Sequence, residues 1–209
     1  MDVIGANKKR DIDYANDMIV QQFLQEHLYS TSKCPNVIRY NDIEHQFAGI
    51  DLKWGNIYVD EKASTYTTNL QTFAHEIGQI NRSGKWQKGW FNDDNCKADY
   101  YVYMFVDGME KEGKVLKNIS KAEIMVIKRS AIIEYLASIG WTMELLTEME
   151  NEIRKAYNTY GKEYWKHIKL SFNDIRFWLS DKLYEQPVNV LISRDKLREL
   201  SKKTVKVNE

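Results

Sequence analysis

The chain has 209 residues, of which 43% are hydrophobic and 12% aromatic, and its 30 basic residues balance its 30 acidic residues. This composition is typical of a folded protein and excludes a broadly cationic coat for nucleic acid or membranes. The length fits a single domain. No apolar run approaches about 18 residues, so we expect neither a membrane span nor a signal peptide. Because only Cys34 and Cys96 are present, we expect a reducing, cytoplasmic setting.

The zero net charge is a sum of unequal parts. Residues 1–81 carry 7 basic and 11 acidic side chains, whereas residues 82–129 carry 10 and 7, and residues 194–209 carry 6 and 3. A local basic rim beside an acidic region is therefore compatible with overall neutrality.

The first half of the chain reads as a helix followed by mostly extended segments. Apolar residues at helical spacing predict a helix over residues 11–28, capped by Asp11 or Asp13. A second helix is predicted over residues 68–80, with Thr67 or Thr68 as its cap. Alternating or β-branched stretches predict strands at residues 37–40, 47–54, 57–64, 86–91 and 98–106. The last of these is apolar enough to be buried on both faces.

The second half is expected to be richer in helix. Strands are predicted at residues 122–128, 168–172 and 188–192, and helices from residue 131, over residues 141–160 and after Ser193 or Asp195. Residues 126–136 and 191–200 look alike, because each places a strand, a basic residue and a cap before a helix. The basic residues of segment 194–206 are expected to lie on a solvated helix.

Residues 49–64 carry the chemistry. Gly55-Asn56 separates two β-favourable runs, and glycine at the first central position suits a two-residue type II′ hairpin turn. That turn sets Leu52 opposite Val59 and Asp51 opposite Asp60. Since side chains alternate along a strand, Asp51, Asp60 and Lys62 are predicted to share one face.

Two carboxylates directly opposite each other on neighbouring strands repel. A divalent cation between Asp51 and Asp60 would remove that repulsion, and oxygen ligands of this kind suit Mg²⁺, with Mn²⁺ as the alternative. Lys62 could hold or deprotonate an attacking water, or stabilise developing negative charge. A metal, two carboxylates and a lysine are suited to metal-assisted hydrolysis of a phosphodiester. The competing interpretation is a hairpin with a solvated polar face.

Asp51 followed by Asp60-Glu61-Lys62 resembles the PD-(D/E)XK nuclease superfamily. The resemblance covers about residues 11–106, and Ile50 stands where the superfamily motif has a proline. It implies an α/β fold with a restriction-endonuclease-like mixed central β-sheet flanked by helices, and residues 107–209 would then be a helix-rich C-terminal elaboration. It also implies Mg²⁺-dependent cleavage of nucleic acid, with DNA as the favoured substrate and a homodimer expected if both strands are cut.

The same resemblance implies roles for individual residues. Asp51 and Asp60 would be the metal ligands and Lys62 the catalytic lysine. A glutamate from the first helix would complete the site; Glu26 is the candidate, expected on the inward face of that helix, and Glu44 is the rival. Gln71 or Gln79 could be the glutamine that some members carry after the motif.

Other signals are weaker. Arg82, Lys85 and Lys88 alternate with tryptophans and glycines, which suggests a loop that contacts phosphates and bases. His75-Glu76 begins like a zinc-protease helix, but Gln79 occupies the position of the second histidine, so His75 is expected to pack or to lie on the surface. The alternative function is a catalytically inactive nuclease-like module that binds nucleic acid or a protein partner.

Overall fold

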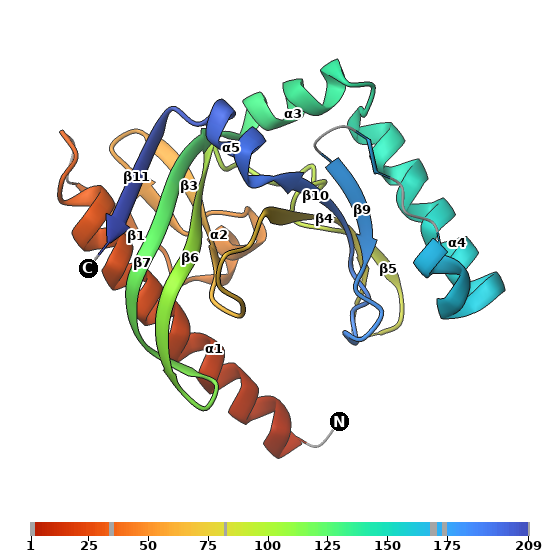
Figure 1. Ribbon diagram of the computed structural model, residues 1–209, viewed down its shortest axis with the longest axis horizontal. Helices are drawn as coiled ribbons and strands as arrows, with labels where there is room; N and C mark the ends of the chain where they lie inside the picture. The colour runs from red at the N-terminus through yellow and green to blue at the C-terminus, as the bar shows by residue number, and fades with distance from the viewer. Residues whose placement is uncertain (1–2, 34–35, 82, 168–170, 173–174, 209) are drawn as a thin grey trace.

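The computed structural model describes residues 3–33, 36–81, 83–167, 171–172 and 175–208, which form a mixed α/β fold built on two sheets (Figure 1). Sheet A runs from edge to edge through β1 (Val37–Arg39), β2 (Leu52–Trp54), β3 (Ile57–Ser64), β6 (Tyr100–Glu112), β7 (Val115–Lys128) and β11 (Lys203–Asn208). Sheet B runs through β5 (Trp86–Lys88), β4 (Thr72–Ile80), β10 (Val188–Ser193), β9 (Ile175–Leu179) and β8 (Ser171–Phe172).

Sheet A is mixed because β3 and β6 pair in parallel, while its other pairs and those of sheet B are antiparallel. After β3 the chain leaves sheet A, forms β4 and β5 of sheet B, and returns as β6. The expected α/β class with a mixed sheet is therefore confirmed.

Helices lie outside the two sheets. They are α1 (Val3–Leu24), a π-helical turn η1 (Gln25–Tyr29), α2 (Ile43–Phe47), α3 (Arg129–Ser138), α4 (Met143–His167) and α5 (Arg194–Leu200). In Figure 1, α1 runs along sheet A and α4 lies on the far side of the molecule, where it contacts β4 and β10. Among the described residues, no helix combines the length and apolar character needed to cross a membrane.

Strand β6 divides the core into two parts, as its sequence predicted. Val102 and Met104 pack with Phe23 and Leu24 of α1, whereas Tyr101, Tyr103 and Phe105 face residues of sheet B. These β6 side chains are fully buried. Because side chains alternate along a strand, one apolar run can supply both cores.

The helix predicted over residues 68–80 is wrong: this segment contains β4. Its apolar residues also fit an alternating pattern, with Phe73, His75 and Ile77 on one side of the strand, and β4 pairs with both β10 and β5. Gly78, where a Cβ atom would meet the side chain of Glu150 at 2.8 Å, is a poor helix residue. Pairing with β10, far away in sequence, outweighed the local helical spacing.

Two further expectations need correction. The strand predicted from residue 47 begins only at Leu52, because Asp42 caps the short helix α2 by accepting a hydrogen bond from the His45 N–H at 3.0 Å. The basic tail is also not one solvated helix, since α5 ends at Leu200 and β11 then pairs with β7. The predicted Ser193 cap is confirmed: its hydroxyl accepts from the Lys196 N–H.

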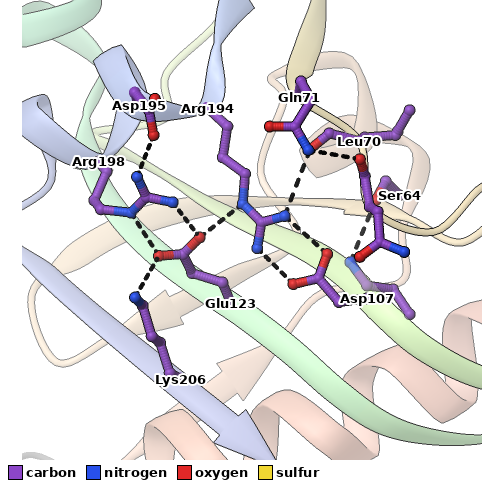
Figure 2. Close-up of polar contacts among 11 residues, drawn as sticks. Ser64, Leu70, Gln71, Asp107, Glu123, Arg194, Asp195, Arg198 and Lys206 are labelled. Carbon is purple, nitrogen blue, oxygen red and sulfur yellow. Dashed lines mark hydrogen bonds and ion pairs between the residues drawn. The ribbon is translucent and has the colours of Figure 1, made fainter.

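A buried polar junction joins the two sheets (Figure 2). Arg194, the first residue of α5, donates two hydrogen bonds to Asp107 of β6, at 2.8 and 2.6 Å, and one to Glu123 of β7 at 2.7 Å. Its backbone N–H donates to the Gln71 carbonyl at 2.8 Å, just before β4. Arg198 binds Glu123 from one helical turn further on. We call these residues the arginine junction.

Candidate active site at the free edge of strand β3

The β2–β3 hairpin has the register that its turn predicted. Leu52 pairs with Val59, Lys53 with Tyr58 and Trp54 with Ile57. Gly55 has a φ of 61°, the left-handed region that a type II′ turn requires at its first central position. Asp51 thus directly precedes β2, beside Asp60 on β3.

Backbone groups hold Asp51 in place. Its N–H donates to the Val59 carbonyl at 2.9 Å, and its own carbonyl accepts from the Tyr40 N–H. Its carboxylate accepts a hydrogen bond of 2.6 Å from the Glu61 N–H. The carboxylate thus pairs with a backbone N–H that a neighbouring strand would otherwise bind. Strand β2 begins only at Leu52, and the rest of this β3 edge has no neighbouring strand in the described part of the chain.

Asp60 is 3% exposed and lies between Asp51 and Lys62. Burial raises the pKa of Asp60 to about 7; the Lys62 charge opposes this rise, whereas the Asp51 charge and a hydrogen bond with Asp51 add to it. Gly49 permits the close approach of the preceding loop, since a Cβ atom there would lie 3.1 Å from the Cys96 Sγ and 3.9 Å from Asp60 Oδ2. The predicted meeting of the two carboxyl groups is therefore present.

Lys62 forms the cationic part of the site. Its Nζ lies 2.6 Å from Asp60 Oδ1 and 4.6 Å from the ring centroid of Trp90. Burial would lower the pKa of Lys62, but the charges of Asp60 and Asp51 outweigh burial and leave it raised. Lys62 is thus an ammonium ion, suited to donating hydrogen bonds to an anion rather than to accepting a proton.

Glu61, the middle residue of the motif, points to the opposite side of β3. Its carboxylate accepts hydrogen bonds from the Tyr29 hydroxyl at 2.6 Å and from Arg39 at 2.7 and 3.2 Å. Arg39 comes from β1 and Tyr29 from the end of the first helical segment, so three elements meet here. Glu61 therefore anchors the strand segment whose N–H holds Asp51. The sequence pattern does not reveal this role, because both partners are distant in sequence.

A cavity of about 330 Å³ opens along this edge of β3. On one side it is bounded by α1, and on the other by residues of sheet B and the loop after β5. The residues that line it are Asp17, Val20, Gln21, Asp51, Glu61, Lys62, Ala63, Thr65, Phe73, Ala74 and Trp90. The hairpin carboxylate and the lysine thus face a space that a ligand can enter.

The acidic residue that the first helix contributes is not the one predicted. Glu26 is exposed and accepts a hydrogen bond from Gln22 at 3.0 Å, so the expected inward orientation is wrong. Its rival Glu44 is also exposed, on α2. Asp17 of α1 lines the cavity instead, and burial together with the charges of Asp13, Asp51 and Glu61 raises the pKa of Asp17. Asp17 lies nine residues before Glu26, closer to the middle of α1.

The donor set fits a divalent cation that keeps most of its water. In the described residues, no group of three or more His, Cys, Asp or Glu side chains could hold a metal ion. Mg²⁺ commonly takes only one or two carboxylates, with water and substrate phosphate completing its shell. Asp51 and Asp60 offer those two carboxylates. Burial and, to a lesser extent, the charge of Asp51 raise the pKa of Asp60, and a bound cation would oppose both effects.

Phe73 and Ala74 of β4 line the cavity, and further polar residues lie on or just before the same strand. His75 is fully buried, with its Nε2 2.7 Å from the Tyr103 hydroxyl, and burial lowers its pKa to about 3. It is thus a neutral packing residue, one of the two roles expected for it. Burial raises the pKa of the neighbouring Glu76 to about 7, in part opposed by the Lys62 charge. Gln71 is exposed and bonded to the Asn69 carbonyl, and Gln79 pairs with Gln87 of β5.

Of the predicted basic loop, the two described lysines, Lys85 and Lys88, are not among the residues that line the cavity. Arg82 lies outside the described residues. Lys85 is exposed in the β4–β5 turn, and Lys88 on β5 forms an ion pair of 2.6 Å with Asp94. Contact of this loop with nucleic acid remains a prediction. Trp90, which follows in sequence, does line the cavity, and its ring contacts the Lys62 ammonium.

Comparisons of this chain with protein-family models, with curated proteins and with solved structures gave no match.

Proposed function

We propose that this protein is a nuclease of PD-(D/E)XK type, which hydrolyses phosphodiester bonds in DNA with the help of a divalent metal ion. One observation carries the proposal: Asp51, which lines the cavity, meets the buried carboxyl group of Asp60 beside the partly exposed ammonium group of Lys62. A structural ion pair would not need the second carboxylate, whose charge destabilises the first.

Each residue has a distinct part in this proposal. Asp51 and Asp60 would hold Mg²⁺ or Mn²⁺, which when bound supplies a Lewis acid and lowers the pKa of coordinated water. Lys62, kept protonated by its acidic neighbours, would donate a hydrogen bond to a phosphate oxygen and orient the attacking water. Trp90 limits the directions open to the lysine because the ammonium lies against its ring.

The test compares cleavage by the wild-type protein and matched variants. Plasmid, linear duplex and single-stranded DNA, with RNA as a further substrate, are incubated with Mg²⁺ or Mn²⁺. We expect Asp60→Asn and Lys62→Ala each to lower the cleavage rate at least a hundredfold, on the order of one lost catalytic group. Asp94→Asn, which removes an exposed carboxylate from the Lys88 ion pair, is the control and should leave the rate unchanged.

Two results would contradict the proposal. One is the absence of wild-type cleavage across the whole substrate panel with either metal, and the other is undiminished cleavage by both variants. Melting curves and circular dichroism spectra of each variant establish that the protein is folded. Metal-independent binding of nucleic acid without cleavage would instead support the inactive binding module.

A further inference from the structure

Tyr66 is an aromatic residue that is exposed and yet held by two contacts. The residue is 76% exposed, although its hydroxyl donates a hydrogen bond of 3.1 Å to Asp13 of α1. Lys111 of β6 donates a hydrogen bond to the Thr65 carbonyl, and its ammonium lies 5.9 Å from the centroid of the Tyr66 ring. A ring fixed in this way loses little conformational freedom when a flat partner stacks on it.

Tyr66 lies next to the lining of the candidate active site, at the end of β3. Thr65, the preceding residue, lines the cavity, and so does Asp17, one helical turn beyond Asp13. The hydrogen bond between Tyr66 and Asp13 therefore joins the end of β3 to the α1 wall of the cavity.

The size of the cavity restricts what can enter. Its volume of about 330 Å³ lies at the lower end of the roughly 300–1,000 Å³ of small-ligand pockets. A single nucleotide unit fits such a space, whereas a double helix does not. Enzymes that act inside a pocket use single-stranded substrate or pull one nucleotide out of the duplex.

The charges around Tyr66 favour different positions for the base and for the phosphate. Asp13 and Asp17 make the α1 side acidic, so it repels phosphates but not the uncharged faces of bases. Lys111 supplies a positive charge 5.9 Å from the centroid of the ring. An aromatic platform beside a cation is the combination by which proteins bind single strands without sequence preference.

We infer that the substrate is a single strand, or an unpaired segment of a longer molecule, with a base next to the cleaved phosphate stacked on Tyr66. Lys111 contacts the adjacent phosphate. This inference rests on the proposed nuclease function and adds to it a class of substrate and a binding residue that touches the nucleic acid outside the catalytic group.

Binding is measured apart from cleavage. The probe is a fluorescent oligodeoxynucleotide of about 12 nucleotides, a length within the range of single-strand sites, in buffer with EDTA. Fluorescence anisotropy gives the dissociation constant for the wild type and for three variants: Tyr66→Ala, Tyr66→Phe and Tyr184→Ala. Tyr184 is a matched control, because it is 57% exposed but lies between β9 and β10 of sheet B.

We expect Tyr66→Ala to weaken binding of the single strand roughly ten- to hundredfold, the size of one lost base stack. Tyr66→Phe should bind within about threefold of the wild type, because the ring remains. Tyr184→Ala should bind as the wild type does. A blunt duplex of the same sequence should bind at least tenfold more weakly than the single strand.

The inference is overturned if Tyr66→Ala binds as tightly as the wild type, or if the duplex binds as well as the single strand. These outcomes are distinct from failure of the nuclease proposal. If the protein cleaves DNA but Tyr66→Ala binds the single strand as tightly as the wild type, only the stacking site is refuted. If Tyr66→Ala weakens binding but the wild type cleaves no substrate, only the catalysis is refuted.

Discussion

Two pairs of neighbouring carboxylates in sheet A and its connections have opposite surroundings. In the arginine junction, Asp107 and Glu123 receive hydrogen bonds from Arg194, and Glu123 receives two more from Arg198 (Figure 2). At the β3 edge, one carboxylate of the pair Asp51 and Asp60 forms an ion pair with Lys62. Glu123 of the arginine junction is buried, whereas Asp51 and Lys62 of the β3 site face a cavity.

The pKa values show what this difference means. The hydrogen bonds from Arg198 and Arg194 outweigh burial and lower the pKa of Glu123 to about 2. Burial raises the pKa of Asp60 to about 7, and Lys62 opposes this only in part. The arginine junction is complete as it stands and is structural. The β3 site sets the single positive charge of Lys62 beside two carboxyl groups, so a further cation would stabilise it, which is the electrostatic property expected of a metal site.

The largest effect should come from breaking the arginine junction. Arg194→Ala leaves Asp107 and Glu123 buried with too few partners, and the loss of one member of a buried ion pair costs about 3–5 kcal/mol. We expect the free energy of unfolding, measured by urea denaturation at pH 7, to fall by that amount. Arg176→Ala, an exposed arginine of β9, is the control. A loss below about 1 kcal/mol would show that the junction is no more than a surface network.

The arginine junction was only partly foreseeable from the sequence. The likeness between residues 126–136 and 191–200 correctly predicted two strand-to-helix connections, since β7 leads into α3 and β10 into α5. Each helix begins with an arginine, and Arg129 donates to the Tyr101 hydroxyl as Arg194 does to Glu123. The acidic partners could not be predicted, because they lie on strands far away in sequence.

The β3 site was more predictable because its central feature is local. The turn at Gly55 sets the hairpin register, and that register places Asp51 beside Asp60. What the sequence could not show depends on long-range packing: the anchoring of Glu61 by Arg39 and Tyr29, and the cavity position of Asp17 rather than Glu26. The wall formed by β4 was missed for the same reason, since its pairing partner β10 follows more than a hundred residues later.

Neutralising Asp60 should have the opposite sign to breaking the arginine junction. A carboxyl group whose folded pKa is raised from 3.8 to about 7 stabilises the fold fully below pH 3.8, and this stability is lost as the pH rises through 7. In EDTA, Asp60→Asn should therefore gain stability relative to the wild type between pH 4 and 8, by about 4 kcal/mol in total.

The pH series also tests the metal. Adding Mg²⁺ at pH 8 should stabilise the wild type and narrow its gap to Asp60→Asn, which has lost a ligand. Glu123→Gln serves as the comparison. Because the pKa of Glu123 is lowered from 4.5 to about 2, its stabilisation is present above pH 4.5 and is lost as the pH falls through 2, with no change between pH 5 and 8. A flat difference between Asp60→Asn and the wild type across this range would contradict the raised pKa.

The smallest effect is expected for Arg198, the outer arginine of the junction. Its side chain is 37% exposed, and without it Glu123 keeps the 2.7 Å bond to Arg194. Arg198→Ala should therefore cost only about 1 kcal/mol in the same urea measurement, as partly screened ion pairs do.

Salt distinguishes the two arginines, since about 1 M NaCl shortens the screening length to roughly 3 Å. The cost of Arg198→Ala should shrink in high salt while that of Arg194→Ala persists, because the inner arginine is shielded from solvent and ions. Equal salt dependence of the two variants would mean that water and ions reach both arginines. The junction would then differ from the β3 site only in its balance of positive and negative charges, and not in its burial.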